Sequence, residues 1–131
     1  MTKPRTPHFR LSEFERRGKC PKRYWRNIQR VMDALEVIRQ ACGALPVSLT
    51  PAGGYRSPAV NKQNKGRASK SQHLLGKAAD IKVKGMSTKK VYAIIARLQV
   101  VGLIPKGGLA AYPSFVHYDI RGRNARWKKA P

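Results

Sequence analysis

Two short segments, residues 71–80 and 115–119, hold four of the nine histidines and carboxylates in this chain, the side chains that best suit a metal ion. The 131 residues include only three histidines and six carboxylates, and two of each lie in these segments. Gly76 lies between His73 and Asp80 and can take a turn conformation that a residue with a Cβ resists. We therefore expect a loop that delivers His73, followed by a strand that carries Asp80.

The second segment supplies another histidine in a pattern typical of a β-strand. Apolar and polar residues alternate over residues 115–120, which is the period of a strand, and His117 lies in this run. His73, Asp80 and His117 together offer two imidazole nitrogens and one carboxylate oxygen, the ligand set of a catalytic zinc with an open fourth position. A lone histidine is more often an ordinary surface or core residue, but the grouping favours a metal site.

These motifs resemble the signature of a known enzyme family. The pattern Ser-x-His-x-x-Gly-x-Ala-x-Asp at 71–80, followed by a distant histidine, is similar to that of the zinc D-Ala-D-Ala carboxypeptidase family. This family includes vancomycin-resistance D,D-dipeptidases and phage L-alanyl-D-glutamate endolysins. The resemblance extends to Gly-Tyr-Arg-Ser at 54–57 and to Phe-Val-His-x-Asp-x-Arg-Gly at 115–122, and weakly to residues 9–14, which resemble the start of small phage-type members.

The resemblance implies a zinc peptidase that hydrolyses peptide bonds in bacterial peptidoglycan, either as a D,D-carboxypeptidase or as an endolysin-like endopeptidase of phage type. Its three Zn²⁺ ligands would be His73, Asp80 and His117. Three further residues are expected at the substrate: Tyr55, Arg56 and Ser71. The fixed charge of Arg56 could hold a substrate carboxylate or stabilise a developing oxyanion. Alternatively, Arg56 could only brace a loop, and Ser71 could hold its own loop by hydrogen bonding.

One position departs from the family pattern. In many members an Asp or Glu three residues before the last histidine ligand accepts the proton during hydrolysis, and here that position is Ser114. Asp119 is our candidate catalytic base in its place, because the strand period puts it on the same face as His117. Asp119 could instead pair with Arg121 or orient a ligand histidine. Two remoter candidates remain, Glu13 and Glu15.

The charge of the chain predicts a polyanionic partner. It has 28 Lys and Arg against 6 Asp and Glu, a formal net charge of +22, which far exceeds what solubility requires. An anionic cell envelope, anionic lipid or nucleic acid would suit this charge. A second class of function therefore stays open. It is a non-catalytic protein with zinc as a structural staple, as in hedgehog signalling domains, which binds nucleic acid or serves in a virion.

The spacing of apolar residues predicts an α+β fold, with a small antiparallel sheet and two main helices packed on it in a single domain. A hydrophobic content of 41% in 131 residues suits one core. The main helices are expected over 22–41 and 88–101, and shorter ones over 13–17, capped by Ser12, and over 58–64. The expected strands are 47–50, 78–83, 109–112 and 115–120.

Both ends of the chain are expected to lie outside the peptidase-like domain at 11–122. Residues 1–10 are predicted to form a basic extended arm and 123–131 a basic tail, whose Trp127 either docks on the core or stacks on a sugar or base. A basic polar loop is expected over 66–70, next to the site.

Cellular context follows from what the sequence lacks. No apolar run approaches the roughly 18 residues of a spanning helix, and no signal-peptide core follows the N-terminus. We expect a monomer made in the cytoplasm that acts at the cell wall or is carried in a virion. Cys20 and Cys42 flank a helix that would hold them on the order of 30 Å apart, so two free thiols are expected.

Overall fold

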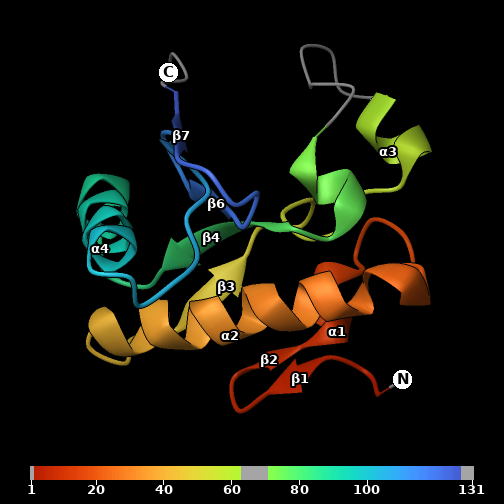
Figure 1. Ribbon diagram of the computed structural model, residues 1–131, viewed down its shortest axis with the longest axis horizontal. Helices are drawn as coiled ribbons and strands as arrows, with labels where there is room; N and C mark the ends of the chain where they lie inside the picture. Colours follow the sequence, from red (N-terminus) through yellow and green to blue (C-terminus); the bar gives the residue numbers. More distant parts are fainter. Residues whose placement is uncertain (1, 63–70, 128–131) are drawn as a thin grey trace.

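The structure, a computed structural model, describes residues 2–62 and 71–127 and has the expected α+β architecture (Figure 1). Its main sheet has five strands in the order β3-β4-β6-β5-β7. They are β3 (Val47–Leu49), β4 (Ala78–Val83), β5 (Gly108–Ala111), β6 (Val116–Asp119) and β7 (Ala125–Arg126). The helices are α1 (Leu11–Phe14), η1 (Lys22–Tyr24), α2 (Trp25–Ala41), α3 (Pro58–Lys62), η2 (Gln72–Leu75) and α4 (Thr88–Val100).

The register of the sheet brings the two motif segments together. Strands β3, β4, β6 and β5 pair antiparallel, as predicted, while β7 is parallel to β5. In the β4–β6 pair, Asp80 lies directly opposite His117. Residues 37 positions apart in the sequence therefore meet on neighbouring strands.

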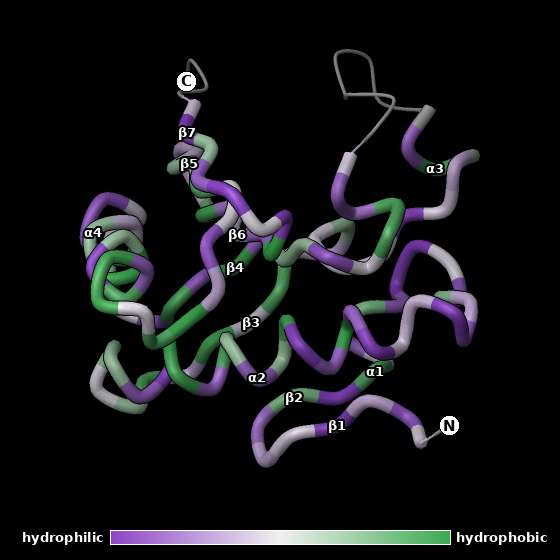
Figure 2. Tube along the Cα trace, in the orientation of Figure 1, coloured by the Kyte–Doolittle hydropathy of each residue, from purple (hydrophilic) through white to green (hydrophobic). Residues whose placement is uncertain are grey.

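The two long helices supply a large share of the core, because each has an apolar stripe at helical spacing. The buried residues of α2 include Ile28, Val31, Leu35 and Ile38, and those of α4 include Val91 and Ile95. Figure 2 shows the resulting alternation of hydrophobic and hydrophilic stretches along α2. Ser87 caps α4, since its hydroxyl accepts a hydrogen bond from the Lys90 N–H at 3.2 Å.

The N-terminal residues differ from the expected extended arm. They form a hairpin of β1 (Arg5–Thr6) and β2 (Phe9–Arg10) that packs on α2, which lies between this hairpin and the main sheet (Figure 1). Phe9 is fully buried, and this burial secures the hairpin to the core. The following helix begins at Leu11, earlier than predicted, because the Glu13 carboxylate accepts the Arg10 N–H at 2.8 Å.

Residues 125–127, expected to belong to the basic tail, instead contact the domain. Strand β7 extends the sheet, and the Trp127 ring lies 5.0 Å from the His117 ring, measured between centroids. Trp127 thus docks on the domain, one of the two expected outcomes. The remaining tail residues 128–131, the expected loop at 66–70 and the end of the helix expected over 58–64 lie outside the described residues.

The other helices and strands match the predicted ones to within a few residues at their ends, except that η2 lies where a loop was expected. Both cysteines are free and buried. Within residues 2–62 and 71–127, no helix combines the length and the apolar character that crossing a bilayer requires.

Candidate metal centre

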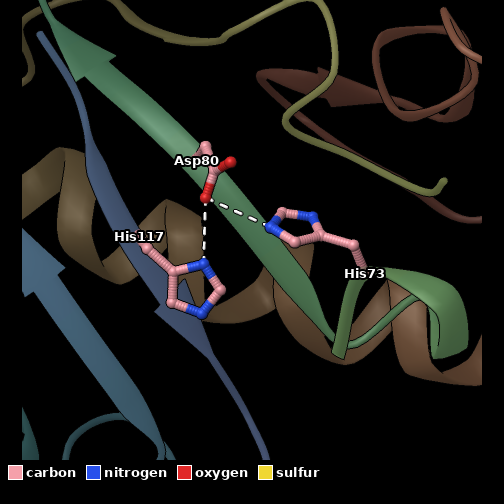
Figure 3. Close-up of side chains that lie close together, drawn as sticks. All are labelled: His73, Asp80 and His117. Carbon is pink, nitrogen blue, oxygen red and sulfur yellow. Dashed lines mark hydrogen bonds and ion pairs between the residues drawn. The ribbon is translucent and has the colours of Figure 1, made fainter. Parts of the chain in front are cut away.

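The side chains of His73, Asp80 and His117 converge at the junction of η2, β4 and β6 (Figure 3). His73 Nε2 lies 3.2 Å and His117 Nδ1 2.9 Å from the same oxygen, Asp80 Oδ1. All three residues are buried, and their ligand atoms lie within 4.8 Å of one another. The structure thus brings together the three residues that the sequence predicts as ligands.

The local sequence explains how His73 reaches the strands. The Ser71 hydroxyl caps η2 by accepting the His73 N–H at 3.2 Å, which is the loop-holding role considered for this serine. Gly76 ends the turn in the left-handed conformation, with φ of +69°. A Cβ at this glycine would come within 3.1 Å of Ile28 Cδ1 on α2, so a larger residue would also crowd the core.

In each histidine, the ring nitrogen that faces away from Asp80, here called the outer nitrogen, contacts a hydrogen-bond acceptor that holds the ring in its orientation. His73 Nδ1 lies 2.8 Å from the Gly54 carbonyl oxygen, and His117 Nε2 lies 2.7 Å from Asp119 Oδ2. Since a carbonyl and a carboxylate oxygen only accept, these nitrogens carry the hydrogens. In the neutral rings that a metal ion requires, the inner nitrogens, which face Asp80, would present lone pairs. Metal-binding histidines characteristically donate their other N–H to a carboxylate or a backbone carbonyl.

This arrangement fits a divalent metal ion. Two histidine nitrogens and a carboxylate oxygen face one another at hydrogen-bond distance, so either a proton or a metal ion lies between them, and the neutral rings would offer two lone pairs to a metal. Imidazole and carboxylate donors suit transition metals. The donor chemistry therefore identifies His73, Asp80 and His117 as a candidate metal centre.

The pKa shifts agree with a site that attracts positive charge. Burial lowers the pKa of His73, which favours the neutral ring that a metal requires. Burial acts in the same direction on His117, but its hydrogen bonds with Asp119 and Asp80 outweigh this effect and raise its pKa. Burial would raise the pKa of Asp80, yet the neighbouring histidines hold it well below its usual range. Asp80 therefore stays ionised.

Arg56 lies at the site and holds the other oxygen of Asp80. Its Nη2 donates to Asp80 Oδ2 at 3.0 Å, and its Nε donates to the Ala52 carbonyl at 2.8 Å. Only 7% of Arg56 is exposed. This position matches the bracing role considered for Arg56 and keeps Asp80 Oδ1 directed at the histidines.

Asp119 is fully buried and accepts five hydrogen bonds. Arg121 donates three of them, through its backbone N–H, Nε and Nη2, and the others come from Gly108 N–H and His117. These bonds hold the pKa of Asp119 well below its usual range, although burial alone would raise it. Such a carboxylate is placed to orient His117, the alternative to the proton-accepting role.

Sequence reasoning missed the residues that make room for Asp119. A Cβ at Gly108 would lie 2.2 Å from Asp119 Oδ2, and one at Gly107 only 1.6 Å from the Asp119 carbonyl oxygen. The pair of adjacent glycines before β5 was the available signal. It marks a close approach between two strands rather than a turn alone.

The remaining acids serve other parts of the protein. Glu13 accepts the Arg10 N–H, and Glu15 accepts the Cys20 N–H at 2.7 Å. Asp33 accepts from Gln29, and Glu36 binds His8. All six carboxylates of the chain fall within the described residues, and each accepts a hydrogen bond. Ser114, at the position of the usual family acid, is exposed between β5 and β6.

Tyr55 and Trp127 occupy positions that the sequence did not specify. Tyr55 is buried near Tyr24, with ring centroids 6.2 Å apart, which favours a core role over the predicted contact with substrate. Trp127 lies between two site residues, 5.0 Å from the His117 ring and 5.3 Å from the Arg121 guanidinium. Its Nε1 donates to the Tyr112 hydroxyl at 3.2 Å.

Comparison with known proteins identified one family. A family model described as Peptidase M15 matches residues 7–119, which include all three candidate ligands and Asp119. No match was found among curated proteins or among solved structures.

Proposed function

The chain belongs to the peptidase M15 family, and from this premise we propose that it is a zinc peptidase that hydrolyses peptide stems of bacterial peptidoglycan. The metal centre supports this proposal, because His73 Nε2, Asp80 Oδ1 and His117 Nδ1 converge at hydrogen-bond distance. This convergence of two histidine nitrogens and one carboxylate oxygen is the single observation that carries the proposal.

Zinc is the metal that we propose, because two histidines and one carboxylate form a catalytic zinc set with one open position. A zinc ion held by these residues would polarise a carbonyl group and lower the pKa of a water molecule towards about 7.

The surrounding residues set the state of the ligands. Asp119 fixes the tautomer of His117, and the Gly54 carbonyl fixes that of His73. Arg56 holds Asp80 in place through its second oxygen. The lone pairs are thus directed before any ligand binds, so little rearrangement opposes binding. We retain Tyr55, Arg56 and Ser71 as predicted substrate contacts, although burial of Tyr55 and the bracing position of Arg56 favour structural roles.

The substrate is proposed from the resemblance of the motifs and from the charge. The resemblance implies cleavage of wall peptides, either as a carboxypeptidase or as a phage-type endopeptidase. The net charge of +22 would concentrate the enzyme at an anionic cell envelope.

A second candidate function is favoured by one observation. Every carboxylate in the chain is engaged, and Asp119 is fully buried, so a dedicated proton acceptor is not evident among the acids. A protein of this kind would keep zinc as a structural staple and act by binding a polyanion.

Digestion of purified peptidoglycan tests the proposal. Wild type should release new amino termini, a chelator should abolish their release, and added zinc should restore it. His73→Ala should be inactive, while His8→Ala, which removes the surface histidine bound to Glu36, should retain activity. The identity of the new termini would show which bond is cut.

Zinc-loaded wild type that releases no new termini would favour the second function. In that case Ser114→Asp, which restores the usual family acid, is the variant to assay. Release of termini by this variant alone would locate the missing group.

A further inference from the structure

A basic groove lies beside the N-terminal hairpin, apart from the metal ligands. Its volume is about 540 Å³, and it is lined by Thr2, Lys3, Pro4, Arg5, Arg10, Leu11 and Ser12. Three of these residues are cations and two carry hydroxyl groups. Among the described residues that line it, none carries a carboxylate. The exposed lining is mainly apolar, and the polar groups of these side chains add donors and positive charge.

The cations of this groove have no ion-pair partner in the described part of the protein. Within residues 2–62 and 71–127, the arginines that pair with carboxylates are Arg56 and Arg121, both at the metal centre. The nearest acid in sequence, Glu13, accepts a hydrogen bond from the backbone of Arg10. The charges of Lys3, Arg5 and Arg10 are thus left for a partner from outside.

The hairpin also places two of these cations against each other. Arg5 and Arg10 lie directly opposite in the β1–β2 pair. Like charges at opposite positions of an antiparallel pair destabilise it. An anion in the groove would relieve this repulsion, so the arrangement favours an anionic ligand.

The groove is held in shape by contacts with α2. Gln29 bonds to both the backbone N–H and the carbonyl of Arg5, at 3.0 and 3.1 Å. Glu36 accepts the His8 backbone N–H at 2.7 Å and contacts its ring at 2.8 Å. Pro4 and Phe9 are buried beneath the hairpin. An anion would therefore bind without ordering this segment first, which lowers the cost of binding.

We propose that this groove binds phosphate groups of a flexible phosphodiester polymer of the cell envelope. Guanidinium groups match the geometry of phosphate oxygens, and the hydroxyls of Thr2 and Ser12 add donors. A single flexible chain can bend into a concave site, whereas duplex DNA presents its phosphates on a stiff convex rod. The phosphate site stands on the groove itself, and only its assignment to the envelope rests on the proposed function.

The test compares two double variants that remove the same charge. Arg5→Gln with Arg10→Gln changes the groove, and Lys89→Gln with Arg97→Gln changes two exposed cations of α4. The probe is a fluorescent oligomer of glycerol phosphate, titrated at fixed ionic strength. The groove variant should bind it at least 10-fold more weakly, and the α4 variant should change affinity less than 2-fold, since a located site loses specific contacts.

Several outcomes would overturn the proposal. Equal losses of affinity in the two variants would show that the total charge, and not the groove, binds the oligomer. Failure of wild type to bind the oligomer would show that the groove is not a phosphate site. Duplex DNA that binds wild type more tightly, with the same dependence on Arg5 and Arg10, would assign the groove to nucleic acid. Thermal melts confirm that the groove variant is folded.

Two further measurements distinguish binding in the groove from binding at the metal centre. Inorganic phosphate should raise the melting temperature of wild type but not that of the groove variant, and equal shifts would contradict the proposal. His73→Ala should keep the affinity of wild type for the oligomer. Wild type that binds the oligomer but releases no new amino termini from peptidoglycan would therefore refute the proposed function and leave the groove intact.

Discussion

At the metal centre charged side chains face partners within the protein, whereas the cations of the N-terminal groove face none among the described residues. Arg56 pairs with Asp80, and Arg121 pairs with Asp119, all at positions that are wholly or largely buried. In the groove, Arg5 lies opposite another arginine. A charged side chain that pairs within the protein holds the geometry of a site. The cations of the groove, unpaired in the part of the chain that the structure describes, are available to a ligand from outside.

The two regions differ because the chain has few acidic residues to pair with its cations. Two of the six carboxylates lie at the metal centre, and the other four accept hydrogen bonds around the N-terminal third of the chain. The 28 Lys and Arg therefore remain largely uncompensated. Removing a cation should accordingly have opposite effects on stability in the two regions.

The largest expected effect follows from removing the internal cation beside Asp80. We expect Arg56→Met to lower the free energy of unfolding of the metal-free protein by about 3–5 kcal/mol, because a buried carboxylate loses its partner. Zinc should recover part of this loss, since a bound divalent ion also neutralises Asp80. Chemical denaturation with and without zinc measures both effects.

The control for this variant is Arg97→Met, which removes an exposed arginine of α4. Its expected effect is within about 0.5 kcal/mol. Similar losses in the two variants would show that the contact between Arg56 and Asp80 contributes nothing particular.

Asp119→Asn tests whether the second buried acid orients a ligand. We expect it to weaken zinc affinity by about 10–100-fold, the usual cost of losing a group that positions a metal ligand. Competition with a chromophoric chelator measures the affinity, and Asp33→Asn, on the surface of α2, should leave it unchanged. Unchanged affinity with a turnover loss of about 100-fold would instead assign proton transfer to Asp119.

In the groove, removing a cation should raise the free energy of unfolding instead of lowering it. We expect Arg5→Gln to stabilise the protein by about 0.2–1 kcal/mol, because it relieves the repulsion with Arg10. Lys82→Gln is the matched strand control, since Lys82 lies opposite the uncharged Ser48 and should show no such gain. Urea denaturation without phosphate measures the effect. A loss of stability in Arg5→Gln would contradict the proposed difference between the groove and the metal centre.

The smallest expected effect concerns the contact between the hairpin and α2. Burial raises the pKa of Glu36, but the neighbouring Thr6 and the hydrogen bonds with His8 outweigh it, so the pKa lies below its ordinary 4.5. Glu36 therefore stabilises the fold above that value, and its contribution is lost as the pH falls below it. Between about pH 6 and pH 3, wild type should lose a few tenths of a kcal/mol more than Glu36→Gln. Equal losses would show that Glu36 does not couple the hairpin to α2.

The cluster of candidate ligands could be predicted from the sequence because its signals are local and its residue types are scarce. His73, Gly76 and Asp80 lie within one short segment, and the strand period places His117. The register that sets Asp80 opposite His117 depends on pairing across the sheet, which no local pattern specifies. The same period put Asp119 near His117 but carried no information on its complete burial.

The two ends of the chain were predicted least well. Strands β1, β2 and β7 have two residues each, too few to show a period. The hairpin depends on Phe9 being covered by a helix that forms later in the sequence, and Trp127 depends on a site assembled from distant strands. Both are tertiary effects that override local polarity.

The metal content of purified protein tests the central claim most directly. Wild type, His73→Ala and His8→Ala would be dialysed against zinc and then against buffer, and analysed for elements per chain. We predict about one zinc in wild type and in His8→Ala, as expected for a site with three protein ligands, and a large loss in His73→Ala. Equal zinc in all three proteins would contradict the assignment of His73, Asp80 and His117 as the metal centre.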